Sequence, residues 1–196
     1  MDALAKKAHF FRRASFGATT AELNSSISTT ELLNQWLDRQ VIASVPSLGA
    51  VEKMGKIRLN QGLKFADWLV NQTIYAENPL QEKVINFWRD HFVVSARKVR
   101  IPQFLTDYDA RLRTYSFGDF RELLWSVTTS PAMLAYLDNA QNRSGKINEN
   151  YSREVMELFT IGRGQYSEKD IQEGARALTG WAIRPNRTLG TATSIF

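Results

Sequence analysis

The sequence predicts an all-α protein, an irregular multi-helix bundle of about nine or ten helices. Three observations lead to this fold class. Helix-start signals recur along the whole chain of 196 residues. Between them, apolar residues repeat at intervals of three and four positions, which is the spacing of one helix face. No stretch alternates apolar and polar residues over several positions, as a strand with one exposed face would.

Capping boxes mark the first helices. Thr19 with Glu22, and Ser28 with Glu31, have the spacing at which each side chain can hydrogen-bond the other residue's backbone N–H. The residues before Thr19 predict a helix with a basic side, and a long helix follows the loop "ASVPS". The predicted helices of this half span residues 3–15, 19–27, 29–42 and 48–75.

Capping residues in front of prolines mark the helices of the second half. Asn78 precedes Pro79, and Ser130 precedes Pro131, so each pair places a capping side chain before a proline in the first helical turn. Ser167 is a weaker start signal of the capping-box kind. The predicted helices span residues 79–95, 101–115, 117–129, 131–138, 147–161 and 167–182.

Three segments lack a helical stripe. Residues 139–147 are predicted as a loop. The most β-like stretch, "HFVVSARKVRI", is predicted as a helix end followed by a loop. After Trp181 the tail "AIRPNRTLGTATSIF" loses helical periodicity. We therefore expect one helical domain over residues 1–182 and a tail or truncated connector over residues 183–196.

The composition excludes several classes of protein. The chain has no cysteine, which excludes disulfides, thiolate metal sites and cysteine nucleophiles. The mild net charge of +5 fits solubility or a weakly anionic partner better than nucleic-acid binding. No apolar run approaches the roughly 20 residues of a membrane span. A polar stretch follows Arg12 and Arg13, unlike a twin-arginine signal, so we expect a cytoplasmic chain or one whose signal has been removed.

The histidines predict no metal site, and no cofactor is predicted. His91 lies on an apolar helix face with Val84, Trp88 and Phe92, which favours a buried structural histidine with a hydrogen-bond partner. His9 has no carboxylate beside it, and a metal site needs more ligands. In the loop "DNAQNRSGKINE", placing Gly145 at position 6 of an EF-hand puts Ala140 at position 1 and Tyr151 at position 12, so the first aspartate and the bidentate glutamate are missing. The segment "GRGQYS" lacks the spacing and the lysine of a phosphate-binding loop.

The segment "NENYSREVMELF", residues 148–159, is the strongest candidate for a polar site. Asn150, Arg153, Glu154 and Glu157 bring amide, guanidinium and carboxylate groups to one helix. They fit an ordinary polar helix face, with Glu149 and Arg153 at i, i+4. They also fit a catalytic carboxylate–amide patch, since two close buried carboxylates raise one pKa. We favour a structural hydrogen-bonded network that ties this helix to the preceding loop.

Basic residues gather at two places in the sequence. Arg97, Lys98 and Arg100 fall within four positions, and Arg12 and Arg13 lie in the first helix. Together they are a candidate patch for phosphate or anionic lipid. An ordinary solvated surface is the alternative, and it is the more common outcome for such clusters.

Three blocks of the chain resemble one bacterial family. They are "HFFRRASFGAT", "LQEKVINFWRDHFVVS" and the long block from "GDFRELLWSV" to "GARALTGW". In this order they resemble the domain-of-unknown-function family numbered 1800 (DUF1800), over residues 9 to 181. The resemblance implies a helical protein that is usually exported or periplasmic. It also implies a gene commonly placed beside one for a DUF1501 protein, which resembles sulfatases or phosphatases.

The resemblance carries no catalytic residue, because family members generally have no assigned activity. Family members also continue well beyond "ALTGW", so we expect this chain to be an N-terminal portion, a truncated gene or a short variant.

Two functions compete. The first is a protein-interaction or scaffold module of an exported or envelope system, which binds a DUF1501-type partner or itself. The alternative is the N-terminal part of a hydrolase-like enzyme that uses the segment around "NENYSREVMEL".

Overall fold

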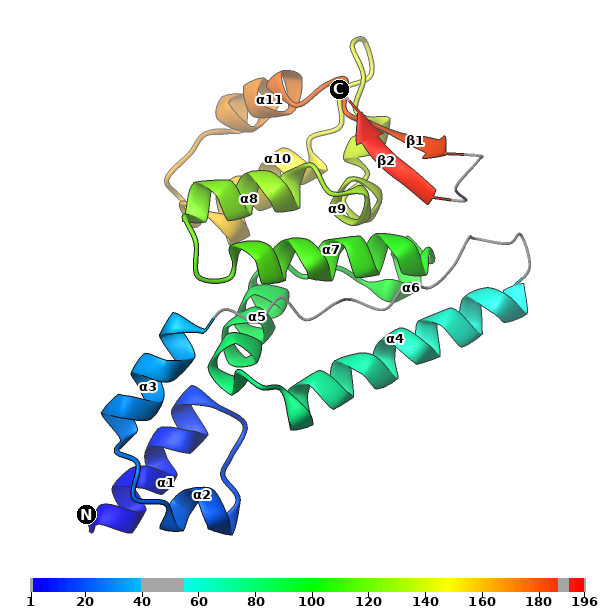
Figure 1. Cartoon of the computed structure of the whole chain (residues 1–196). Coiled ribbons are helices and arrows are strands. Elements are labelled where there is room, and N and C mark those ends of the chain that lie inside the picture. Colours follow the sequence, from blue (N-terminus) through cyan, green and yellow to red (C-terminus); the bar gives the residue numbers. More distant parts are fainter. Residues whose placement is uncertain (1, 40–54, 187–190, 196) are drawn as a thin grey trace.

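The computed structural model describes residues 2–39, 55–186 and 191–195. It confirms the all-α class: the described residues form eleven α-helices, one short 3-10 helix and one π-helix, and only two short strands. The helices build an elongated molecule with a small N-terminal lobe at one end (Figure 1). The two termini lie toward opposite ends of this shape.

Helices α1 (Ala3–Ala14), α2 (Thr20–Asn24) and α3 (Thr29–Asp38) form the N-terminal lobe. The predicted capping box at Thr19 is present, and the Ser28 side chain accepts from the third residue of α3. Phe11 of α1 and Trp36 of α3 are buried and pack edge to face, with ring centroids 5.8 Å apart. Asn78 Nδ2 donates to the Trp36 carbonyl oxygen at 2.6 Å, which ties the lobe to the start of α5.

The lobe's helices are shorter than predicted. The second ends at Asn24 rather than residue 27, because Ser25 adopts an extended backbone and caps it. The third ends at Asp38, and the predicted residues 40–42 lie outside the described part of the chain, as do residues 43–47 of the predicted loop.

The middle of the molecule consists of α4 (Gly55–Tyr75), α5 (Pro79–His91), α6 (Ala96–Val99) and α7 (Pro102–Tyr115). Helix α7 runs through the centre and contacts α4, α5, α6, α8 and α9. The predicted start of α4 at residue 48 lies outside the described residues. The predicted loop after α5 contains the one-turn helix α6, which is too short to show a periodic pattern.

The C-terminal part contains helices α8 (Phe120–Thr128) and α9 (Pro131–Tyr136), the 3-10 helix η1 (Asn139–Gln141), α10 (Asn150–Glu154), the π-helix η2 (Val155–Phe159), α11 (Glu168–Ala177) and strands β1 (Ala182–Asn186) and β2 (Thr191–Ile195). The predicted caps at Ser130 and Ser167 are confirmed. The first predicted loop of this region, 139–147, begins with η1. The predicted helix 147–161 changes from α to π at Val155.

The tail after Trp181 forms two short strands. Its two strands pair antiparallel, with Ala182 opposite Ile195 and Asn186 opposite Thr191, and both contact α9. Each strand has five residues, and the first contains Pro185, so neither presents the long alternation that predicts a strand.

Close packing joins α10 to α11 at a glycine. A Cβ atom on Gly174 would lie 2.4 Å from Ser152 Oγ and 3.0 Å from Met156 Cε. Ser152 is buried, and its hydroxyl donates to the Ile171 carbonyl oxygen at 2.8 Å. A side chain at position 174 would therefore displace the Ser152 hydroxyl from its hydrogen bond to Ile171 or move the two helices apart.

The main core lies between α5, α7, α8, α9 and the α10–η2 segment. Its buried members include Ile85, Phe92, Phe104, Leu112, Leu123, Val127, Met133, Tyr151 and Phe159. The Tyr151 hydroxyl donates to Thr128 at 2.6 Å, and burial raises the pKa of Tyr151 well above its ordinary value. Tyr151 therefore enters the core as a neutral, hydrogen-bonded group.

A buried ion network links α5 to α7. Arg113 pairs with Glu82 and, through Nε at 2.7 Å, with Asp109, while Arg89 Nε donates to Asp109 at 2.8 Å. The side chains of Glu82, Asp109 and Arg113 are only 3%, 2% and 2% exposed. The Arg113 guanidinium also lies 4.6 Å from the ring centroid of Trp68 on α4. Two cations and two anions give this network a net charge of zero.

The network keeps Arg113 charged. Burial by itself lowers the pKa of Arg113, but the hydrogen bonds and charges of Glu82 and Asp109 outweigh it, so the pKa lies above its ordinary value.

Candidate functional site

The four predicted site residues of "NENYSREVMELF" do not form one network. Asn150 Nδ2 donates to the Leu137 carbonyl oxygen at 3.2 Å, which ties α10 to the end of α9. Arg153 turns the other way: it pairs with Glu168 of α11 at 2.8 Å and with Glu149 at 3.4 Å. The ion pair between Glu149 and Arg153 that the spacing predicts is therefore present, but the closer partner of Arg153 lies on another helix.

The two glutamates are also separated in their contacts. Glu157 pairs with Arg163 and accepts from the Tyr166 hydroxyl at 3.1 Å. The side chain of the half-buried Glu154 makes no hydrogen bond or ion pair to any described residue. The single polar network proposed for these residues is wrong, because the π-helix and the turn after it direct Glu157 to its own partners.

Buried asparagines, not the glutamates, form the polar network of this region. Asn142 is fully buried: its Nδ2 donates to Asn139 Oδ1 at 3.1 Å and to the Ala175 carbonyl oxygen at 2.7 Å, and its Oδ1 accepts from the Asn148 N–H at 3.0 Å. Asn139 Nδ2 in turn donates to the Leu178 carbonyl oxygen at 3.4 Å. These bonds hold the 139–148 loop against α11, so the amides have a structural role.

The basic residues do not form one patch. Arg12 and Arg13 are exposed on α1 in the N-terminal lobe, whereas Arg97, Lys98 and Arg100 lie on or beside α6, far from that lobe (Figure 1). Lys98 Nζ also pairs with Asp138 at 2.6 Å, which reduces its availability to an anion.

His91 lies in a cluster of aromatic rings at the surface. Its Nε2–H donates to the Phe159 carbonyl oxygen at 3.0 Å, so the predicted hydrogen-bond partner is confirmed, although the side chain is only half-buried. The ring lies 6.1 Å from Phe87, 6.5 Å from Phe120 and 5.7 Å from Trp88, measured between centroids. Three separate elements, α5, α8 and η2, meet at this histidine.

We call the outer side of this cluster the aromatic face: Phe87, Trp88, His91 and Phe120. Phe87 is 59% exposed and Phe120 is 41% exposed. Leu158 and Ile161, which flank Phe159 and the end of η2 in the chain, are also more than half exposed. Large apolar side chains that gather in this way on a surface mark interaction sites more often than isolated ones do.

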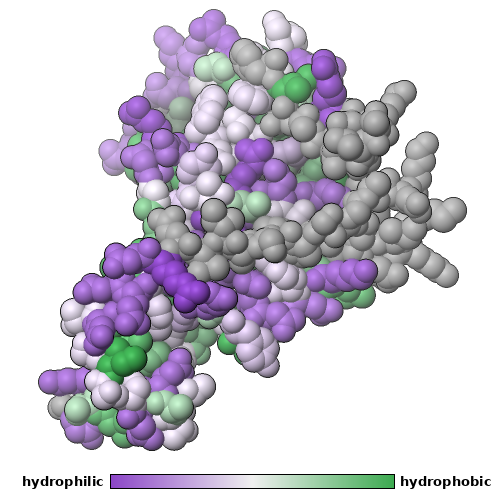
Figure 2. Space-filling view, viewed as in Figure 1, coloured by the Kyte–Doolittle hydropathy of each residue, from purple (hydrophilic) through white to green (hydrophobic). Residues whose placement is uncertain are grey.

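In the coloured part of Figure 2, hydrophilic residues predominate and hydrophobic residues form small groups, one of them over the N-terminal lobe. The described residues contain no group of three or more histidine, aspartate or glutamate side chains that could hold a metal ion. No described helix is both long enough and apolar enough to cross a membrane.

One family model matches the chain, over residues 9–196, and its description is "Protein of unknown function (DUF1800)". The chain belongs to the DUF1800 family. No curated protein and no solved structure matches it. The membership that the three sequence blocks indicated is thus confirmed, and it extends beyond them into the β1–β2 tail.

In this DUF1800 chain, one of the blocks that carried the resemblance contributes residues to both the buried ion network and the aromatic face. "LQEKVINFWRDHFVVS" supplies Glu82 and Arg89 to the ion network and Phe87 and His91 to the aromatic face. The sequence interpretation treated this helix only as core. Phe87 falls on the same helical stripe as Val84, Trp88 and His91, so the apolar spacing contained no signal that its ring would be exposed.

Proposed function

We propose that this DUF1800 chain is a helical protein-interaction module and that it binds a partner protein through the aromatic face. One observation carries the proposal: Phe87 and Phe120, from two different helices, meet at a half-buried histidine and remain 59% and 41% exposed. Aromatic side chains in this setting lose water and gain area when a partner covers them.

The internal contacts of the face support a preformed site. Trp88 Nε1 donates to the Ser116 carbonyl oxygen at 3.0 Å, and His91 is held by the Phe159 carbonyl oxygen. Both rings are therefore fixed before binding, so less side-chain entropy is lost when a partner docks. Apolar side chains of a protein partner fit this face better than a charged ligand does, because its exposed rings offer no charge.

The family resemblance suggests the identity of the partner. A DUF1501-type protein is the first candidate, within an exported or envelope system, and a second copy of this chain is the next. Both partners would cover the same rings, so one pair of variants tests both.

The test is co-expression with the DUF1501-type protein of the same organism, followed by size-exclusion chromatography and titration of the purified partners. Phe87→Ser and Phe120→Ser should each weaken the complex by about tenfold or more. Leu63→Ser is the matched control, because Leu63 is 54% exposed on helix α4, which contributes no residue to the aromatic face.

Sedimentation at several concentrations tests self-association with the same three variants. The proposal fails if the wild type forms neither complex, or if the two phenylalanine variants bind as tightly as Leu63→Ser.

A further inference from the structure

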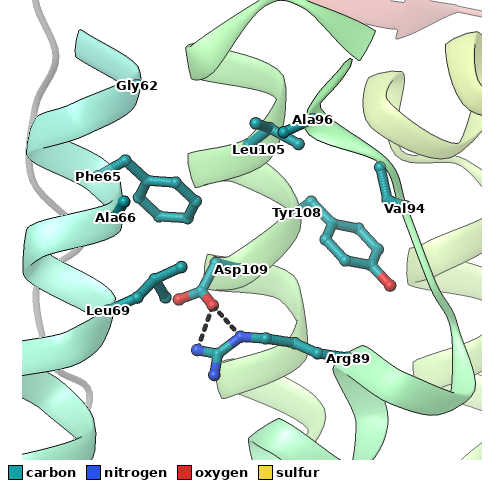
Figure 3. A pocket seen from close by; sticks show the side chains of 10 residues that line it. All are labelled: Gly62, Phe65, Ala66, Leu69, Arg89, Val94, Ala96, Leu105, Tyr108 and Asp109. Carbon is teal, nitrogen blue, oxygen red and sulfur yellow. Dashed lines mark hydrogen bonds and ion pairs between the residues drawn. The ribbon is translucent and has the colours of Figure 1, made fainter. Parts of the chain in front are cut away.

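A cavity of about 270 Å³ opens between α4, α5 and α7, on residues that the aromatic face does not use (Figure 3). Phe65 and Leu69 project from α4 toward Leu105 and Tyr108 of α7. Gly62 and Ala66 leave room on α4, since a Cβ atom on Gly62 would meet nothing within 4 Å.

The body of the cavity is apolar. The Tyr108 hydroxyl donates to the Phe92 carbonyl oxygen, so the phenol contributes its ring to the wall and its polar atom to the core. Burial is the main reason that the pKa of Tyr108 is raised, and the group stays neutral. Walls of this kind favour an apolar molecule, because water would find few hydrogen-bond partners there.

The ion pair between Arg89 and Asp109 lies at one end of the cavity (Figure 3). Asp109 Oδ1 accepts from Arg89 Nε and Nη2, and Asp109 Oδ2 accepts from Arg113 Nε. Each oxygen of Asp109 therefore has at least one donor partner. Arg89 carries five N–H groups, and Asp109 and Asn86 accept from three of them. Arg89 lines the cavity and has two N–H groups with no hydrogen-bond acceptor among the described residues, whereas each oxygen of Asp109 already accepts at least one hydrogen bond.

The charge balance limits the ligand further. Arg89, Arg113, Glu82 and Asp109 sum to zero, so an anionic ligand would leave a net negative charge in a buried setting. A neutral ligand whose oxygen accepts from Arg89 adds no charge. We propose that this cavity is a binding site for one small, neutral, apolar molecule with a single acceptor group, such as a medium-chain ketone, ester or alcohol.

The cavity volume sets the ligand size. An apolar cavity of about 150 Å³ holds benzene, so 270 Å³ accommodates a chain of about eight carbons. Octan-2-one is therefore a suitable probe, and octanoate is its anionic counterpart with the same chain length.

The experiment is isothermal titration calorimetry of the full chain with octan-2-one and with octanoate. Wild type should bind octan-2-one at one site and bind octanoate at least about tenfold more weakly. Gly62→Leu fills the cavity and should weaken octan-2-one binding by about tenfold or more. Lys64→Leu is the matched control, because it adds the same side chain about 200° away on the same helix.

Melting temperatures check that both variants fold. Gly62→Leu should melt at or above the wild-type temperature, since leucine is the better helix former. The proposal is overturned if wild type shows no saturable binding of octan-2-one up to about 1 mM. Equal binding by wild type and Gly62→Leu would also overturn it. Tighter binding of octanoate than of octan-2-one would refute the neutral-ligand assignment.

Discussion

Replacement of Arg113 by methionine tests the buried ion network directly. The change removes one of two cations, so the network goes from a net charge of zero to −1. Glu82 and Asp109 are 3% and 2% exposed, and water cannot replace the lost guanidinium. Stranding a buried charge in this way costs about 3–5 kcal/mol of unfolding free energy. The lost contact with Trp68 adds to the loss.

A second variant separates charge from packing. In Glu82→Met/Arg113→Met, one anion and one cation leave together, and Arg89 still pairs with Asp109. The network is neutral again, so this double variant should be clearly more stable than Arg113→Met alone. Lys98→Met is the control, since it breaks an ion pair at the surface, whose loss is about 0–1 kcal/mol.

The assay is urea unfolding followed by far-ultraviolet circular dichroism. Two results would refute the reasoning. One is a loss below about 1 kcal/mol for Arg113→Met, which would show that solvent reaches the carboxylates. The other is a double variant whose loss equals the sum of the losses measured for Glu82→Met and Arg113→Met singly, which would show that the charges do not interact.

Two further predictions concern α11. Gly174→Ala should lower the unfolding free energy by about 1–3 kcal/mol because its Cβ would clash with Ser152. In the control Gly62→Ala the new Cβ meets no neighbour, so the unfolding free energy should stay equal or rise. Equal effects of the two substitutions would contradict the close packing at Gly174. Hydrogen bonds from the Ser167 backbone and side chain lower the pKa of Asp170 below its ordinary 3.8. The carboxylate's contribution is therefore present above that value and lost as the pH falls through the folded-state pKa. Asp170→Asn should flatten the acid limb of the urea midpoint against pH, and an unchanged limb would contradict this.

Helix starts could be predicted from the sequence because their signals are local. Ser28, Asn78, Ser130 and Ser167 each accept a backbone N–H as their spacing predicts. A capping residue acts within one turn, so no distant contact is needed to recognise it.

The contacts of the candidate site could not be predicted in the same way. Arg153 has a favourable partner four residues away, yet its stronger partner, Glu168, is set by how α11 docks. Glu82 and Arg113 are 31 residues apart, and charged residues in a sequence are most often exposed. One local signal was available, since Asp109 and Arg113 form an i, i+4 pair. Its burial depends on helices whose packing the sequence pattern does not specify.

The π-helix η2 has a consequence for insertions and deletions. A π turn contains about one residue more than an α turn, so the segment holds one residue that a regular helix would not need. Deleting one residue within Val155–Phe159 would let a regular α-helix complete in four residues about the same rotation that the π turn makes in five, so Phe159 would keep roughly its place. Deleting a second residue would turn Phe159 by about 100°, away from the core and from His91. A contact made 68 residues away in the chain therefore limits this segment to the loss of one residue.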